Sequence, residues 1–309
     1  MKPRDLLDLI LLAAIWGSSF LFMRLLVPSF GPVALAFVRV AGASLFLLPI
    51  LLLRGEWPVL RRHWRAMIIL GLTNSALPFL LFGYAVTTLP AGLTAIFNAA
   101  TPLFTALIAW AWLGDPLTRW RSLGLALGFA GVAGLAGYKS LVSGNLQSLQ
   151  FDSQSALAIA ACMAGALMYG HAASYTKRYL PGLPAMVMAA GTQIAAAIAL
   201  ALPAALTWPA ALPVATDWLM AAALAVLASG VAYILYFRLI TRVGPTQASS
   251  VTFLVPVFAI LWGATLLGEQ VTLPMLIGGA VILAGTALVL GLLPRRRAPG
   301  PPGRPESST

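Results

Sequence analysis

Long apolar stretches follow one another along this chain, and they leave few folds open to it. A helix that crosses a bilayer needs about 20 mostly apolar residues. We expect such helices at residues 6–26, 33–53, 65–86, 91–113, 120–138, 156–177, 184–206, 216–240, 246–267 and 273–293. Only 9% of the residues are charged, against roughly 25% in a soluble domain. The sequence therefore predicts an all-α polytopic membrane protein with ten transmembrane helices.

The basic residues give these helices a direction. The formal net charge is +11, which in a soluble protein would suggest a nucleic-acid partner. With ten helices and a cytoplasmic N-terminus, however, nearly all of the 19 Lys and Arg residues fall in cytoplasmic loops, and only Arg24 and Lys139 fall outside. Cytoplasmic loops of membrane proteins are enriched in Lys and Arg. We therefore expect both termini to be cytoplasmic, the lipid bilayer as a partner, and no nucleic acid.

The two halves of the chain share a pattern. The segment TPLFTALIAWAWLGDPLT (Thr101–Thr118) is echoed by VPVFAILWGATLLGEQVT (Val255–Thr272), with matching prolines and Leu-Gly-acid triplets. The offset of 154 residues (272 − 118) also pairs Ser75 with Ser229. Each half then holds five helices, an odd number, so the second half enters the membrane upside down. Two inverted five-helix repeats are a transporter architecture with the binding site near the bilayer midplane.

The repeat divides the chain. We expect a first repeat over residues 1–138, a connecting loop over 139–155, a second, inverted repeat over 156–293, and a cytoplasmic tail over 294–309 that is disordered because Pro, Gly and Ser dominate it. Glycines recur in the last helix of each half, among them Gly124 and Gly285. Small residues permit close helix packing, so we expect a scaffold pair there, with a dimer face as the alternative. We expect a monomer, and a dimer is possible.

The pattern resembles the EamA-type repeat of the drug/metabolite transporter superfamily. The resemblance rests on Pro256, the Leu267-Gly268-Glu269 triplet, Thr272, Gly278 and Gly285, with a weaker copy in the first half and the AIWGSS opening of the first helix. It covers both halves and implies a secondary transporter of the bacterial cytoplasmic (inner) membrane. Among superfamily members the sequence looks most like amino-acid exporters, including aromatic amino-acid exporters. The implied partner is an amino acid or a similar metabolite.

Polar and aromatic side chains near the middle of the expected helices are the candidate substrate ligands. They are Trp16, Phe20, Asn74, Ser75, Phe79, Asn98, Thr101, His171, Tyr175, Ser229, Tyr233 and Thr252. An aromatic lining with few charges suits a flat or apolar body that carries a small polar handle. Any single aromatic is more often a packing residue or an interface anchor, and we read Tyr84 and Tyr236 as anchors because they fall near helix ends.

Two prolines that the offset pairs, Pro102 and Pro256, fall inside expected helices. A proline leaves the carbonyl four residues earlier without its donor, here the carbonyls of Asn98 and Thr252. Freed backbone groups at membrane depth are tolerated where they are buried in protein or line a watery cavity. We therefore predict that both prolines are gating hinges, and a simple packing kink is the alternative.

Arg39 and His171 are ionisable groups inside expected spans, and such groups mark functional sites by default. The offset pairs Arg39 with Gln193 (193 − 39 = 154), an unusual polar residue within a span, and we assign both a structural or coupling role. Arg39 could instead reach out to the membrane interface. His171 is the strongest candidate for a proton carrier, with a neutral packed histidine as the alternative.

Three functions compete for this sequence: export of metabolites such as amino acids, export of drug-like cations, purines or other metabolites, and intramembrane catalysis. Small drug exporters of the superfamily carry an acid within the first helix, and no expected span here has a central acid. The chain contains neither a His-Glu-x-x-His motif nor a P-loop, so we expect neither catalysis nor ATP coupling. The single cysteine, Cys162, excludes a disulfide framework and a cysteine metal cluster. We expect no cofactor and no bound metal.

Overall fold

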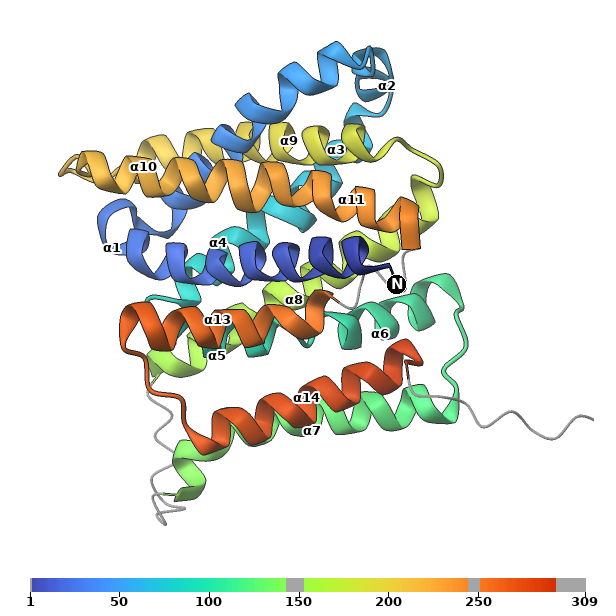
Figure 1. Cartoon of the computed structure of the whole chain (residues 1–309), viewed down its shortest axis with the longest axis vertical. Helices are drawn as coiled ribbons and strands as arrows, with labels where there is room; N and C mark the ends of the chain where they lie inside the picture. Colours follow the sequence, from blue (N-terminus) through green and yellow to red (C-terminus); the bar gives the residue numbers. More distant parts are fainter. Residues whose placement is uncertain (1, 143–152, 244–250, 293–309) are drawn as a thin grey trace, which may run out of the picture.

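The fold is a bundle of helices whose long axes run roughly side by side (Figure 1). The computed structural model describes residues 2–142, 153–243 and 251–292, and within these ranges every regular element is a helix. Seven helices in the described part are long and apolar enough to cross a membrane, and Val251–Leu267 is a shorter apolar helix. The chain is therefore an all-helical, multi-pass membrane protein. The arrangement as ten helices in two inverted repeats stays a prediction.

Most helices begin and end close to the expected residues. The elements are α1 (Pro3–Leu53), α2 (Trp57–Arg62), α3 (Trp64–Gly71), η1 (Leu72–Ala76), α4 (Leu77–Ala85), α5 (Ala91–Asn98), α6 (Thr101–Leu113), α7 (Arg119–Val142), α8 (Ser153–Tyr179), α9 (Ala185–Leu206), α10 (Ala215–Ala223), η2 (Leu224–Val231), α11 (Ala232–Val243), α13 (Val251–Leu267) and α14 (Leu273–Leu290). The expected helix at 246–267 and the loop at 139–155 lie partly outside the described residues, and the expected tail at 294–309 lies wholly outside them.

The first element, α1, combines two of the expected helices. Helical structure continues to the end of the first leg at Phe30 and resumes after Gly31, whose φ of 71° and ψ of 161° break the helix. Pro28 and Pro32 flank this break, and glycine adopts a positive φ at little cost because it has no Cβ. The two legs of α1 consequently run in different directions (Figure 1), with no loop between them.

Three of the expected helices are interrupted, and only the interruption next to Pro102 was expected from the sequence. The π-helical segment η1 separates α3 from α4, and η2 separates α10 from α11. Two residues, Ala99 and Ala100, separate α5 from α6. Single π-helical turns inside α-helices are rare and occur mostly at functional sites. The two of this chain contain Ser75 and Ser229, which the 154-residue offset pairs.

At one end of the bundle α7 and α14 lie side by side (Figure 1). A Cβ built on Gly124 would lie 2.7 Å from the carbonyl oxygen of Gly285, and a Cβ built on Gly285 would lie 2.5 Å from the amide nitrogen of Gly128. Backbone this close permits only glycine on either side. These glycines therefore form a tight helix–helix contact within the chain.

Candidate substrate cavity

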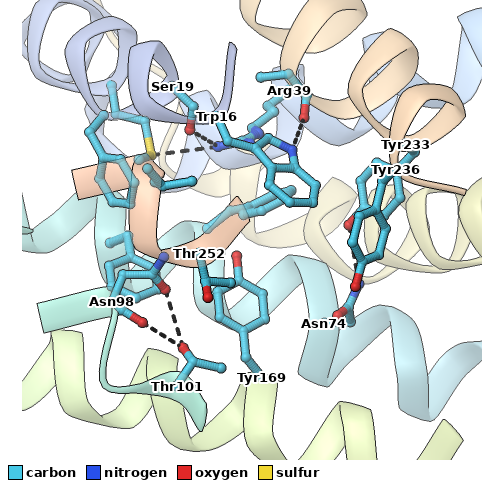
Figure 2. A pocket seen from close by; sticks show the side chains of 16 residues that line it. Trp16, Ser19, Arg39, Asn74, Asn98, Thr101, Tyr169, Tyr233, Tyr236 and Thr252 are labelled. Atoms are coloured by element: carbon cyan, nitrogen blue, oxygen red, sulfur yellow. Dashed lines mark hydrogen bonds between the residues drawn. The ribbon is translucent and has the colours of Figure 1, made fainter. Parts of the chain in front are cut away.

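A cavity of about 260 Å³ lies among helices from both halves of the chain (Figure 2). It is lined by side chains from α1, η1, α4, the α5–α6 junction, α8, η2, α11 and α13. The lining residues are Trp16, Ser19, Phe20, Met23, Arg39, Asn74, Phe79, Phe82, Asn98, Thr101, Tyr169, Ala228, Tyr233, Tyr236, Thr252 and Val255. The walls are aromatic with neutral polar groups between the rings, and Arg39 contributes the one charge among these residues.

Eight of the twelve candidate ligands line this cavity. They are Trp16, Phe20, Asn74, Phe79, Asn98, Thr101, Tyr233 and Thr252. Ser75 and Ser229 lie behind the wall, fully buried, where each supports a residue of the opposite half, as described below. His171 and Tyr175 are not among the lining residues. Tyr236 lines the cavity, so the expectation that it is an interface anchor is wrong, whereas Tyr84 is half exposed at the surface of the described part of the chain.

The segment η2 positions one aromatic wall. The indole Nε1 of Trp16 donates a hydrogen bond to the carbonyl oxygen of Ala228 in η2, at 3.2 Å. The Trp16 ring contacts Tyr233 and Tyr236, with centroids 6.4 Å and 5.2 Å apart. A π-helical turn changes which carbonyls are taken by the helix itself. The interruption therefore places a backbone acceptor where it fixes a ring of α1 against α11.

Arg39 points into the cavity from the second leg of α1, with only 5% of the residue exposed. Its Nε donates to Ser229 Oγ at 2.9 Å, and one Nη donates to Ser19 Oγ at 3.3 Å. The guanidinium carbon lies 3.7 Å from the ring centroid of Phe79, a cation–π contact. These contacts hold Arg39 at the cavity, so it does not extend toward the membrane interface.

Gln193 repeats the Arg39 arrangement in the other half. The Nε2 of Gln193 on α9 donates to Ser75 Oγ in η1 at 3.2 Å. The offset of 154 residues pairs Gln193 with Arg39 and Ser75 with Ser229, so each half supplies a long polar side chain that binds the serine in the π-helical segment of the other half. Such crossed contacts are what the predicted two-fold relation between the halves would produce. Gln193 is fully buried and does not line the cavity.

The two prolines occupy different local structure. Pro102 is at the start of α6, a position where proline is favoured, and the Asn98 carbonyl accepts a hydrogen bond from the Thr101 hydroxyl at 2.8 Å. Pro256 lies inside the continuous helix α13. Both prolines are buried. Helix breakage therefore accompanies only the first of the pair, although Asn98 and Thr252 both face the cavity.

On α8 the structure turns a different helix face to the cavity from the one the sequence suggested. His171 stacks on Trp112, with centroids 5.4 Å apart and planes 12° apart, and on Tyr175 at 6.0 Å. The cavity instead receives Tyr169, which stacks on Phe82 at 5.9 Å. A Cβ built on Gly165 would lie 2.8 Å from the Phe82 ring. That close approach brings the Gly165–Tyr169 face of α8 inward, and the i, i+4 spacing of these two residues was the signal that could have revealed it.

None of the acids in the described ranges is among the residues that line the cavity. Asp8 on α1 pairs with Arg238 at 2.6 Å and Arg242 at 3.4 Å on α11, and Asp115 pairs with Lys177 at 2.7 Å. The carboxylate of Glu269 accepts a hydrogen bond from the Ala91 amide at 2.9 Å at the start of α5. A carboxylate at this position accepts hydrogen bonds from the first amides of the helix and is stabilised by the positive end of the helix dipole. Glu269, which lies between α13 and α14, therefore connects that part of the second half to the start of α5 in the first half, outside the cavity.

The fold and the cavity among its helices are those of a multi-pass helical membrane protein of the transporter class. The chain belongs to the EamA-like transporter family, whose profile matches residues 6–137 and 156–291. The inner membrane transporter YedA of Escherichia coli (strain K12) is 30% identical over 306 residues, covering 94% of each chain. A probable terminal-alkyne amino-acid exporter of Streptantibioticus cattleyicolor is 27% identical over 302 residues, covering 96% of this chain and 97% of the exporter.

The fold is also similar to a solved one. A crystal structure aligns with a TM-score of 0.65 and 20% sequence identity, covering 94% of this chain and 99% of the other. At this identity the likeness concerns the fold alone. The family match, and not this likeness, makes the chain a membrane transporter of the EamA-like family.

Proposed function

We propose that this protein exports small metabolites, amino acids and aromatic amino acids among them, across the cytoplasmic membrane. The observation that carries the proposal is the cavity, whose walls combine aromatic rings such as Trp16 and Tyr169 with neutral polar groups such as Asn98 and Thr252. Rings accept a flat body, and the polar groups orient a small handle. The similarity to a probable amino-acid exporter supports the same class of substrate.

Transport proceeds by alternating access between two inverted halves. The crossed Arg39–Ser229 and Gln193–Ser75 contacts support this mechanism, because they join the halves by equivalent interactions. When the two halves move relative to each other, the cavity opens first to one side of the membrane and then to the other. Both termini then lie in the cytoplasm, as the distribution of Lys and Arg predicts.

Export of drug-like cations is a weaker candidate. A cation in a cavity of low polarity needs a carboxylate partner, and no acid is among the residues that line the cavity in the described part of the chain. The charge that Arg39 brings there repels a cation instead. We therefore place cationic drugs below metabolites that are neutral overall or negatively charged.

A transport assay with purified protein in proteoliposomes tests the proposal. Liposomes preloaded with unlabelled compounds should accumulate the labelled form by exchange, and the panel should contain the twenty common amino acids and the purines, with and without a pH gradient. Exchange of phenylalanine, tyrosine or tryptophan above the level of protein-free liposomes is the expected result. Absence of exchange for every compound of the panel would contradict the proposal.

A further inference from the structure

The cavity contains a positive charge that the described protein does not neutralise. Arg39 takes part in none of the ion pairs formed between residues 2–142, 153–243 and 251–292. Its hydrogen-bond partners are the hydroxyls of Ser19 and Ser229, with the sulfur of Met23 at 3.7 Å. All of these are neutral acceptors. The charge of Arg39 is therefore stabilised by dipoles and by the Phe79 ring alone.

The acids in the described part of the chain do not supply a partner for Arg39. Asp5 and Asp8 are bound to arginines of α11, Glu56 to Arg54, Asp115 to Lys177, and Glu269 to the start of α5. Asp217 lies in the first turn of α10. Asp152 and Glu306 fall outside the described residues. No acid of the described residues therefore lines the cavity or pairs with Arg39.

The geometry of the guanidinium leaves donors directed at a ligand. Nε and one Nη make the hydrogen bonds to the two serines, while the other Nη donates to no residue of the described chain. Arg39 lines the cavity although only 5% of the residue is exposed. In Figure 2 it lies beside Ser19 and Trp16, with Asn98 and Thr101 on the other side of the cavity. A guanidinium held this way presents its remaining N–H groups to the cavity.

From this arrangement we infer that the transported substrate carries a carboxylate, which Arg39 binds, next to an apolar ring that the aromatic walls receive. Arginine matches a carboxylate better than any other side chain does, because its planar donors fit two oxygens. A charged residue buried at membrane depth is stabilised when a ligand of opposite charge joins it. This inference rests on the proposed transport function and narrows its substrate class to organic anions and amino acids bound by their carboxylate.

The same arrangement sets the role of an amino group. An ammonium in this cavity meets neutral oxygens, such as those of Asn98 and Thr252, and no carboxylate among the lining residues. The amino group therefore contributes less to binding than the carboxylate. Replacing the carboxylate by an amide keeps the size and shape of the ligand, removes its negative charge and isolates the contact with Arg39.

Four ligands with the same phenyl body form the test. Phenylalanine and 3-phenylpropionate carry the carboxylate, and phenylalaninamide and 3-phenylpropanamide carry the amide, so that each pair is matched with and without the ammonium. Binding to the detergent-purified protein can be followed by calorimetry and by the total tryptophan fluorescence, to which Trp16 of the cavity contributes together with the other eight tryptophans. We expect each carboxylate to bind about 10- to 100-fold more tightly than its amide, as for hydrogen bonds to charged groups. The ammonium should change affinity by less than about fivefold.

Variants of Arg39 complete the experiment. Arg39→Gln should remove the preference for the carboxylate over the amide in both pairs, and Arg39→Lys should keep part of it. Arg54→Gln is the matched control, because Arg54 ends the same helix and its side chain is exposed; the preference should be unchanged. Thermal unfolding of each variant identifies any that fail to fold, and the unmodified protein tests the preference without substitution.

The outcomes separate this inference from the proposed function. Equal binding of acids and amides, tighter binding of the amides, or a carboxylate preference that survives in folded Arg39→Gln overturns the inference while exchange in proteoliposomes still supports transport. Binding by none of the four ligands overturns the pairing of a carboxylate with a phenyl body. If the carboxylates bind as expected but nothing is exchanged, the inference stands and the transport proposal fails.

Discussion

Arg39 and Gln193 occupy equivalent places in the two halves of the chain, and each binds the serine of a π-helical segment in the opposite half. They differ in charge and in what lies beyond the serine. Arg39 reaches the cavity and rests on Phe79, whereas Gln193 is fully buried and does not line the cavity. Two positions that the 154-residue offset pairs thus make equivalent contacts with a serine, but only the position in the first half carries a charge.

Placing an arginine at position 193 should have the largest effect of any substitution that tests this comparison, and the quantity it lowers is the stability of the protein. Gln193→Arg places a charge where the described residues offer only Ser75 as a hydrogen-bond partner and the side chain is fully buried. An uncompensated buried charge costs about 3 kcal/mol or more. We expect a fall of several degrees in the unfolding temperature and a low yield of monodisperse protein.

The opposite substitution is the matched control. Arg39→Gln recreates in the first half the pair that the second half already contains, so the glutamine can bind Ser229 as Gln193 binds Ser75. Its unfolding free energy should stay within about 1 kcal/mol of the unmodified protein. Fluorescence-detected size exclusion after heating measures both variants. Equal stability of Gln193→Arg and Arg39→Gln would show that the two places are not as different as their burial suggests.

The second comparison between the halves concerns the paired prolines. Pro256 lies inside α13, so Pro256→Ala supplies an amide to the Thr252 carbonyl and stiffens the helix beside the cavity. One added hydrogen bond, at about 1 kcal/mol, corresponds to roughly fivefold slower exchange. Pro102→Ala should change exchange by less than about twofold, because Pro102 begins α6 after a break at which proline is favoured.

Exchange rates in proteoliposomes, measured at equal protein incorporation, check this order. A larger effect of Pro102→Ala would indicate that the gap between α5 and α6 is the moving joint. Unchanged exchange in the double variant would mean that both prolines only shape the packing of their helices.

Much of the fold followed from the sequence, because each helix must be long enough for the bilayer and apolar enough to enter it. The cavity residues Trp16 on α1 and Asn74 in η1 were also predicted from the sequence, because each stands out among apolar neighbours. The offset paired Arg39 with Gln193 and Ser75 with Ser229. It did not predict the hydrogen bonds that cross between the halves, from Arg39 to Ser229 and from Gln193 to Ser75. Those depend on how the halves dock, which a repeat in sequence does not specify.

The features that the sequence did not predict are decided by contacts between helices. Neither η1 nor η2 contains a proline, so tertiary contacts decide these two segments, whereas the break at Ala99–Ala100 comes just before Pro102 at the start of α6. On α8 both faces carry an aromatic residue, and the choice between Tyr169 and His171 rests on the close approach of Gly165 to Phe82. In an apolar solvent, hydrophobicity does not distinguish the face toward the protein from the face toward lipid.

Substitution of His171 is expected to change transport least of all, in contrast to substitution of Arg39. Both are ionisable groups within helices, but the His171 ring stacks on Trp112 and on Tyr175 and is absent from the cavity lining. A proton carrier must exchange protons in step with substrate binding, and a ring held outside the cavity by two aromatic neighbours is poorly placed for that. We expect His171→Gln to leave exchange, and any response to a pH gradient, within about twofold of the unmodified protein, as for substitutions away from the working groups. Proteoliposome flux with and without a pH gradient measures this, with Arg39→Gln as the positive control for a cavity residue. Loss of gradient-driven accumulation in His171→Gln, with exchange at equal pH preserved, would identify His171 as the proton carrier and would show that the stacked ring reaches the substrate path during the cycle.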